Sequence, residues 1–433
     1  MKANSIKALW LVLLAAAVPA TAGDHVSGWG AVVGAPELDR WIADAVSDSA
    51  ALDVRRGSVS TAQEITALAR STGRPDLSLE GDWRRGRSNE PGADTETVTM
   101  EPFAGRARLE WEFDLFGRIR SAVGAARYAE EVAGRELEAR ELTLAAELAR
   151  QYVQGRYLAE QLSLRRRAVE ANKAIAGYRA NRAAAGLVRP EEVDRARAVT
   201  RAAEARVESA REQWEMLAAR WRYLAPADSV PPLDEHTGEL GEVPVPPPEG
   251  ELHSYAVLRP DVRGAYAAWQ EAGRAASATA RDRRPIVTAI ASAEGEGPSP
   301  VEDPEGWTAW AGVRLSLPVL APGRAASTRV ARSRTLVSES LYNDAVSRAV
   351  LDLQESYARR VRAERSWRAA REAADLLKTR LGSTEQRLEK GLAARPEVER
   401  ARTLWLAAEE QALALQARTL QEHLSLLRAC GGP

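Results

Sequence analysis

The chain has a single cysteine, Cys430, and only four histidines, His25, His236, His253 and His423. One cysteine cannot form a disulfide within the chain, and the histidines are too scattered to have the spacing of metal ligands. The sequence also has no nucleophile motif, and no glycine-rich phosphate loop placed between a strand and a helix. We therefore expect no metal centre and no cofactor, and the sequence does not predict an enzyme.

An excess of either charge is missing as well. The 60 lysine and arginine residues nearly balance the 61 aspartate and glutamate residues, which gives a formal net charge of -1. A chain with this balance has no bulk electrostatic attraction to a polyanion. We therefore expect no nucleic-acid partner.

Long apolar runs are absent except at the N-terminus. Lys2 and Lys7 precede an apolar run over residues 8–18, and small residues follow it as far as Ala22. This pattern predicts a signal peptide over residues 1–22, because the run is shorter than the ~20 residues of a membrane-spanning helix. No cysteine follows the predicted cleavage site, so we expect no lipid anchor there. Any membrane span would therefore be made of β-strands.

The stretch from Arg106 to Leu115 alternates without a fault between apolar and charged side chains. A period of two predicts a β-strand with two different faces, and ten residues are about the ~9–11 that a tilted transmembrane strand needs. One face facing lipid and the other a watery lumen would explain the pattern. The apolar face has Ala107, Leu109, Trp111, Phe113 and Leu115, and the charged face has Arg106, Arg108, Glu110, Glu112 and Asp114.

A long helix is predicted directly after this strand, from Arg118 to about Ala185, and a shorter one from Pro190 to Leu224. Before the strand, we expect a helix over residues 36–71 and a second strand near residues 77–83. The strands form a hairpin with a long loop. Trp83, Trp111, Trp307 and Trp310 lie in or beside predicted strands, where aromatic girdles are expected at a membrane interface.

The second half of the chain repeats the first with offsets of only 205 to 210 residues. It is predicted to have strands over 286–294 and 307–317, a long helix over 324–389 and a last helix with leucines spaced by seven residues. We therefore expect a first repeat over residues 23–224, a proline-rich connector over 225–250 and a second repeat over 251–433. Matching pairs include Arg74-Pro75 with Arg284-Pro285, Gly117-Arg118 with Gly323-Arg324, and Gly186-Leu187 with Gly391-Leu392.

Four strands in one chain cannot close on themselves, and an open sheet edge is not tolerated in hydrocarbon. Two chains would supply eight strands and three would supply twelve, so a homo-oligomer is required. In each repeat two helices of about 35 residues, laid end to end, would match one long helix of about 66–68. Such a set of helices suits the wall of a tube.

The segment from Trp111 to Arg120, Trp-Glu-Phe-Asp-Leu-Phe-Gly-Arg-Ile-Arg, resembles the strand-to-helix signature of the TolC-type outer-membrane efflux family, which includes NodT- and OprM-like proteins. The Gly-Leu pairs at 186–187 and 391–392 resemble the turns at the periplasmic tips of that family. The segment from Arg259 to Arg263 resembles another recurring family segment. The resemblance covers residues 36–432.

This resemblance implies an α+β membrane protein. Long helices would form a trimeric periplasmic α-barrel, and four strands per chain would contribute to a 12-stranded transmembrane β-barrel. The implied function is the outer-membrane exit duct of a tripartite efflux or secretion system. The implied partners are two further copies of the chain, a periplasmic adaptor, an inner-membrane RND or ABC transporter, and outer-membrane lipid.

The resemblance also assigns candidate site residues. It implies that adaptor docking involves the tip turns Gly186, Leu187, Gly391 and Leu392, and that a periplasmic gate involves Glu191, Glu192, Glu397 and Arg400. Ion pairs among such tip residues would hold the entrance shut, although charges in a first helical turn also simply complement the helix dipole. The alternation of the strand, independently of the resemblance, predicts that Glu110, Glu112 and Asp114 line the lumen.

An alternative is a periplasmic coiled-coil structural or adaptor protein that never enters the membrane. An adaptor should have a single β-rich insertion between two helices. The twice-repeated unit of a strand pair with helices favours the duct.

Overall fold

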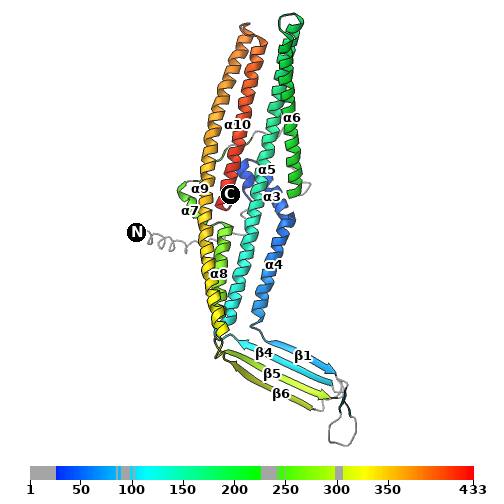
Figure 1. The fold of residues 1–433 in the computed structure, drawn as a ribbon, viewed down its shortest axis with the longest axis vertical. Helices are drawn as coiled ribbons and strands as arrows, with labels where there is room; N and C mark the ends of the chain where they lie inside the picture. The colour runs from blue at the N-terminus through cyan, green and yellow to red at the C-terminus, as the bar shows by residue number, and fades with distance from the viewer. Residues whose placement is uncertain are drawn as a thin grey trace, which may run out of the picture. The chain divides into compact units, whose positions relative to one another are not determined.

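The structure is a computed structural model that describes residues 26–83, 86–88, 98–100, 103–225, 240, 243–247, 249–297 and 306–433 (Figure 1). The predicted signal peptide and most of the predicted connector lie outside these residues. The chain forms two compact units, and each takes segments from both predicted repeats. We call residues 1–53, 138–260 and 346–433 the helical unit, and residues 54–137 and 261–345 the sheet unit.

Both halves of the chain begin with helices, continue with a pair of long strands and end with a long helix and a shorter helix, and the first half has two additional short strands between its long ones. The first set is α2 (Trp29–Val33), α3 (Glu37–Asp48), α4 (Ala50–Ser71), β1 (Asp76–Trp83), β2 (Gly86–Ser88), β3 (Val98–Met100), β4 (Phe103–Phe113), α5 (Arg118–Ala184) and α6 (Pro190–Leu224). The second set is η2 (Glu249–Glu251), α7 (Leu252–Ala256), α8 (Pro260–Arg281), β5 (Ile286–Gly297), β6 (Gly306–Ser316), α9 (Pro322–Glu389) and α10 (Arg395–Cys430).

The sheet unit contains one four-stranded sheet in the order β1-β4-β5-β6, in which every neighbouring pair is antiparallel (Figure 1). The register places like residues in the same row across the strands. One row contains Leu77, Leu109, Ala291 and Ala311, and an adjacent row contains Ser78, Arg108, Ser292 and Trp310. Because successive residues point to opposite faces, the sheet has one apolar and one polar face. The alternation seen in β4 therefore extends over all four strands, and β1 and β6 are the two edges.

The predicted strand at Arg106–Leu115 ends two residues early, at Phe113. The carboxylate of Asp114 instead accepts hydrogen bonds from the backbone N–H groups of Ile119 (3.0 Å) and Arg120 (2.9 Å). These groups lie in the first turn of α5 and have no partner within the helix, so the carboxylate that caps them ends the strand. The expectation that Asp114 and Leu115 are strand residues was wrong for this reason.

The predicted single helix over residues 36–71 is also wrong in detail, because it is two helices. Ser49 has an extended backbone (φ -73°, ψ 111°), and its carbonyl accepts the N–H groups of Leu52 and Asp53 at 2.9 and 3.1 Å. A serine in this conformation begins a new helix, α4. The short helix α2 and the short strands β2 and β3 were not predicted.

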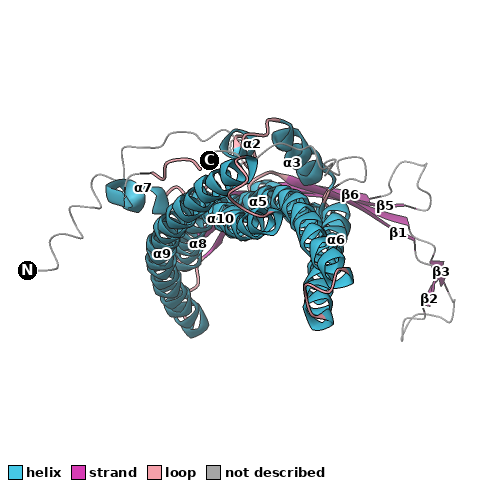
Figure 2. Ribbon diagram, turned by 90° about the horizontal axis from the view of Figure 1, so that it is seen from above, coloured by secondary structure: helices cyan, strands magenta, loops and turns pink. Residues whose placement is uncertain are grey.

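The long helices agree with the sequence prediction to within two residues. α5 has 67 residues and α9 has 68, so each is about 100 Å long at ~1.5 Å per residue. In Figures 1 and 2, α6 lies beside α5 and α10 lies beside α9 in the helical unit. Ion pairs join both couples, Lys173 with Glu204 at 3.7 Å and Arg371 with Glu409 at 2.8 Å.

The core of the helical unit consists mainly of aliphatic side chains, with a few buried aromatic residues such as Trp29 and Trp221. Trp29, Leu38 and Ile42 come from the N-terminal helices, and Leu148, Leu353 and Leu424 come from α5, α9 and α10; all are completely inaccessible to solvent. No described helix has a stretch long and apolar enough to cross a membrane.

Candidate functional site

The two predicted tip turns have the same backbone geometry. Gly186 and Gly391 adopt left-handed conformations, with φ of 72° and 70°. The next residues, Leu187 and Leu392, each donate an N–H to the carbonyl five residues earlier, at 2.9 and 2.7 Å. This is the Schellman arrangement that ends helices, and it favours glycine because only glycine has no Cβ to clash at positive φ.

Both tip turns present a leucine to solvent. Leu187 is 64% exposed and Leu392 is 66% exposed. Neither side chain contributes to the core of its own chain, so both are available to a partner.

The four predicted gate residues follow these turns: Glu191, Glu192 and Glu397 lie in the first turns of α6 and α10, and Arg400 lies in the second turn of α10. Glu191, Glu397 and Arg400 are exposed and Glu192 is half-buried. Within the part of the chain that the structure describes, none of the four forms an ion pair. The Glu397 carboxylate only caps its own helix, accepting the N–H of Ala394 at 3.5 Å. Their charges are therefore available to groups outside this chain.

The polar face of the sheet carries ion pairs that cross its strands. Arg106 on β4 lies between Glu80 on β1, at 3.8 Å, and Glu294 on β5, at 3.2 Å. The Glu110 carboxylate forms ion pairs with Arg108 of its own strand at 2.6 Å and with Arg314 of β6 at 3.5 Å. Acidic residues outnumber arginines on this face among the described side chains. The acids are Asp76, Glu80, Asp82, Glu110, Glu112 and Glu294, and the arginines are Arg106, Arg108 and Arg314.

The three predicted lumen residues therefore differ in their surroundings. Glu110 and Glu112 both lie on the polar face, and Glu112 pairs with Arg118 of α5 at 2.7 Å. Asp114 lies beyond the strand as the helix cap. Although burial raises the pKa of Asp114, its hydrogen bonds from Arg120 and Ile119 outweigh this and hold the pKa below its usual value. It stays ionised, as a cap for helix N–H groups requires.

The tryptophans of the sheet do not all share one face. Trp83, Trp111 and Trp307 lie in rows of the apolar face, and Trp111 donates its indole N–H to the carbonyl of Gly73 at 3.1 Å. Trp310 lies in the polar row with Arg108. The sequence contained this signal, because positions 307 and 310 differ by an odd number of residues and so point to opposite faces.

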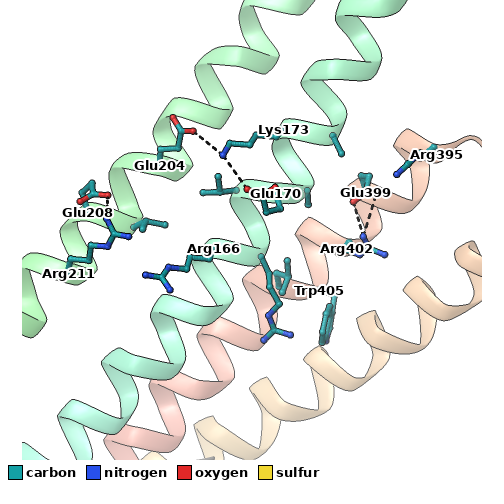
Figure 3. Close-up of a pocket in the computed structure, with 16 residues that line it drawn as sticks. Arg166, Glu170, Lys173, Glu204, Glu208, Arg211, Arg395, Glu399, Arg402 and Trp405 are labelled. Atoms are coloured by element: carbon teal, nitrogen blue, oxygen red, sulfur yellow. Dashed lines mark hydrogen bonds and ion pairs between the residues drawn. The ribbon is translucent and has the colours of Figure 1, made fainter. Parts of the chain in front are cut away.

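A cavity of about 900 Å³ lies in the helical unit and is lined by α5, α6 and α10 (Figure 3). Most of the charged groups in it are paired. Lys173 contacts Glu170 at 3.2 Å, and Arg402 contacts Glu399 at 3.2 Å and Glu385 at 2.9 Å. The first two of these pairs lie within α5 and α10, whereas the Arg402–Glu385 pair joins α10 to α9, so most charges that line the cavity are already compensated by neighbours.

A buried polar cluster fixes the connector to the helical unit. Arg360 on α9 is completely buried and donates to the carbonyl of Pro244 and to the carboxylate of Glu364, both at 2.7 Å. From α10, Gln416 donates to the carbonyl of Leu240 at 3.3 Å. The described part of the connector is thus held by its carbonyl groups. The sequence contained a signal for the burial of Arg360, because Arg360 lies seven residues after Leu353 and therefore on the same face of the helix.

His423 of α10 belongs to the same cluster and is only 3% exposed. Burial, and then the charge of Arg360, lowers the pKa of His423 to about 4, while Glu364 acts in the opposite direction. Its Nδ1 atom has no hydrogen-bond partner within the part of the chain that the structure describes. Among the described residues there is no cluster of His, Cys, Asp and Glu that could hold a metal ion.

Comparison with solved structures gives several similar folds. The outer membrane protein VceC of Vibrio cholerae has a TM-score of 0.77 and 20% identity, covering 93% of this chain and 98% of that chain. The open-state MtrE outer membrane channel of Neisseria gonorrhoeae has a TM-score of 0.77 and 22% identity, covering 92% and 89%. The CmeC outer membrane channel of Campylobacter jejuni has a TM-score of 0.76 and 16% identity, covering 94% and 88%. At these identities the likeness concerns the fold.

Comparison with curated proteins gives no significant match. The family model for outer membrane efflux proteins matches the chain twice, over residues 41–221 and 252–432. Together these segments cover most of the chain and include the strand pairs, the long helices and the tip turns of both halves. The chain belongs to the outer membrane efflux protein family.

Proposed function

We propose that three copies of this chain form an exit duct through the outer membrane and across the periplasm. The observation that carries this proposal is the four-stranded sheet, which has one apolar face, one charged face and two unpaired edges, β1 and β6. An unpaired edge cannot remain in hydrocarbon, so β1 of one copy pairs with β6 of the next to give a closed transmembrane sheet of twelve strands. The charged face then lines the aqueous passage, with Glu110 and Glu112 on it.

The duct would work as part of a tripartite system, with a periplasmic adaptor and an inner-membrane RND or ABC transporter supplying substrate and energy. Family membership and the printed description of MtrE as an outer membrane channel with an open state support this role. The chain would reach the outer membrane after cleavage of its signal peptide behind Ala22, without a lipid anchor. Intact-mass measurement of the mature protein tests both points.

The test of the duct is assembly and conductance. Outer-membrane fractions should contain a trimer that migrates more slowly on a gel before boiling than the dissociated monomer does after it, and the purified trimer should form channels in planar bilayers. A soluble monomer that is indifferent to detergent would contradict the proposal. It would support the alternative of a periplasmic coiled-coil adaptor, for which the sheet's exposed apolar face has no explanation.

We propose further that Leu187 and Leu392 at the tips contact the adaptor. Replacing both with aspartate should abolish co-purification with the adaptor and leave the trimer intact, because neither side chain packs in its own chain. The matched control is Leu336→Asp on α9, since Leu336 is similarly exposed (65%) but lies in the sheet unit. Unchanged co-purification of the double variant would contradict docking at the tips.

We propose that Glu191, Glu192, Glu397 and Arg400 hold the periplasmic entrance closed through contacts between chains. The support is that these charges have no ion-pair partner among the residues of their own chain that the structure describes, where three of the four are exposed. Each surface pair is worth only ~0–1 kcal/mol, but the set is repeated three times around the axis. Arg400→Glu should increase single-channel conductance or open time, with the exposed Arg365→Glu as control. Unchanged gating would contradict the proposal.

A further inference from the structure

The sheet unit carries three unpaired arginines where its helices lead into its strands. The turn before β1 reads Gly73-Arg74-Pro75, and the turn before β5 reads Arg283-Arg284-Pro285. The side chains of Arg74, Arg283 and Arg284 are exposed, and none has a hydrogen bond, ion pair or ring contact within the described chain. Most arginines close to them are paired, including Arg118 with Glu112 and Arg120 with Asp114.

Exposed apolar side chains occupy the complementary turns, where the strands lead back into the helices. Leu115 and Phe116 between β4 and α5 are 62% and 43% exposed. Leu317, Val319 and Leu320 between β6 and α9 are 56%, 80% and 95% exposed. Side chains of this kind are costly in water, and they lie at the end of the sheet where the helices begin.

Trp111 links the first arginine turn to that apolar face. Its ring lies in an apolar row, packs against Phe113 at 4.5 Å between ring centroids, and donates its N–H to the carbonyl of Gly73. Arg74 is the next residue. The unpaired guanidinium of Arg74 therefore follows directly from the border of the apolar surface.

An apolar surface bordered by unpaired guanidinium groups fits the boundary between hydrocarbon and phosphate in a membrane. Arginine extends its aliphatic part along apolar surface while its head reaches the headgroups, and its planar fork matches phosphate oxygens. Asp282, the acid in the second turn, lies 3.9 Å from Arg118, and among the described residues it forms no ion pair with the two arginines that follow it. A net anionic headgroup is the partner that such a surface favours.

We propose that Arg74, Arg283 and Arg284, with the apolar turns beside them, form a collar that binds anionic phospholipid in the leaflet facing the helices. This inference rests on the proposed membrane-spanning function and adds a lipid class to it. The internal duplication supports the collar, because the Arg-Pro pair stands at the same place in both repeats. Three copies of the chain would place nine such arginines around the duct.

The test measures how strongly the reconstituted trimer selects lipids. Spin-labelled phosphatidylglycerol and phosphatidylcholine, each added to bilayers of phosphatidylcholine, give a relative association constant from the motionally restricted component of the spectrum. The wild type should prefer phosphatidylglycerol. The variant with Arg74→Gln, Arg283→Gln and Arg284→Gln should lose most of that preference, since each arginine near an anionic surface accounts for about a fivefold factor.

The matched control replaces three exposed arginines of the helical unit that also have no side-chain partner among the described residues, with Arg201→Gln, Arg365→Gln and Arg380→Gln. It removes the same charge and should keep the wild-type preference. A collar variant that still selects phosphatidylglycerol would overturn the proposal. Loss of the preference in the wild type on adding millimolar inorganic phosphate would also overturn it, because it would indicate a site for the free anion.

Two further measurements separate other outcomes. If the wild type does not insert into either bilayer, the proposed duct fails, whereas insertion and conductance without lipid preference contradict only the collar. If the collar variant does not form trimers, two other measurements of the preference for phosphatidylglycerol test the collar. One uses the variant with lysine at the same three positions, and the other is a salt titration of the wild type. Retained preference with lysine and its decline with salt support the collar, and a preference that salt does not change refutes it.

Discussion

Replacing Gly391 with alanine isolates the cost of the backbone conformation at the second tip turn. The residue has φ of 70°, and an added Cβ would meet no atom within 4 Å. No clash with neighbouring groups contributes, so only the backbone conformation changes in energy. For an L-residue the left-handed conformation costs roughly 1–2 kcal/mol. The alanine also restricts the unfolded chain and recovers about 0.4–1 kcal/mol, which leaves a net local destabilisation of about 1 kcal/mol.

A matched control is the glycine nine residues earlier, inside the helix that precedes this turn. Gly382 is within α9, has no positive φ, and also has open space around an added Cβ. Gly382→Ala should therefore stabilise by roughly 0.5–1 kcal/mol, because glycine is unfavourable inside a helix. The same chemical change has opposite signs at the two positions. The first repeat offers the same pair at the same spacing, Gly186 with Gly177.

Hydrogen exchange measured by mass spectrometry on the trimer reads this local energy. The N–H of Leu392 donates to the carbonyl of Arg387, and it exchanges only when the turn opens. A destabilisation of 1 kcal/mol corresponds to about fivefold faster exchange of peptides covering Leu392. Gly391→Asn should cost less than alanine, since asparagine tolerates the left-handed region.

The outcome that contradicts this reasoning is equal or slower exchange at the tip in Gly391→Ala. It would mean that the turn is not left-handed in the assembled protein, or that a partner chain fixes it by other contacts. Faster exchange in Gly382→Ala as well would show that any side chain added to α9 is unfavourable, and the backbone argument would then fail.

Three further predictions concern charged and buried groups. The pKa of His423, about 4 in the folded chain, lies below its usual 6.5, so the unfolded chain binds more protons between these values. The free energy of unfolding should fall by about 3 kcal/mol as the pH drops from 6.5 to 4. His423→Asn should reduce this pH dependence in melting curves recorded across the same range. An unchanged pH dependence in the variant would show that His423 is not its cause. Arg360→Met should lower the free energy of unfolding by about 3 kcal/mol, because it breaks a buried charge pair. It should also speed proteolysis of the connector near Pro244, because the hydrogen bond that holds this segment is lost. A connector that resists proteolysis in the variant would contradict the role of Arg360 in holding it. Because acids outnumber arginines on the polar face of the sheet, the channel should select cations. The double variant Glu80→Gln, Glu294→Gln should move the reversal potential measured in a salt gradient toward that of an unselective pore. An unchanged reversal potential would indicate that this face does not line the lumen.

Local physics determined the elements that the sequence predicted well. Pro190 begins α6 because proline's fixed φ suits a first helical turn, and Gly186 and Gly391 end α5 and α9 because they accept positive φ. The alternation in β4 was visible because its period is two. Each of these features depends on residues within a few positions of one another.

Contacts between distant segments determined what the sequence did not. Arg106 lies between Glu80 and Glu294 only because β4 pairs with β1 on one side and with β5 on the other. Arg106 and Glu294 are 188 residues apart in the sequence. Arg360 and His423 meet only because α9 packs on α10. The break at Ser49 and the cap at Asp114 are local, but their signals, serine and aspartate beside a helix start, compete with the strong helical and strand periods around them.

The sequence by itself therefore determined the positions and lengths of the long helices, the two faces of the central strand and the turns at the helix tips, because these depend on short-range backbone and periodicity effects. The tertiary structure decided which charges compensate one another and which remain free, such as Arg74, Arg283 and Arg284, because the pairing of charges depends on strand register and helix packing between segments that are far apart in the chain.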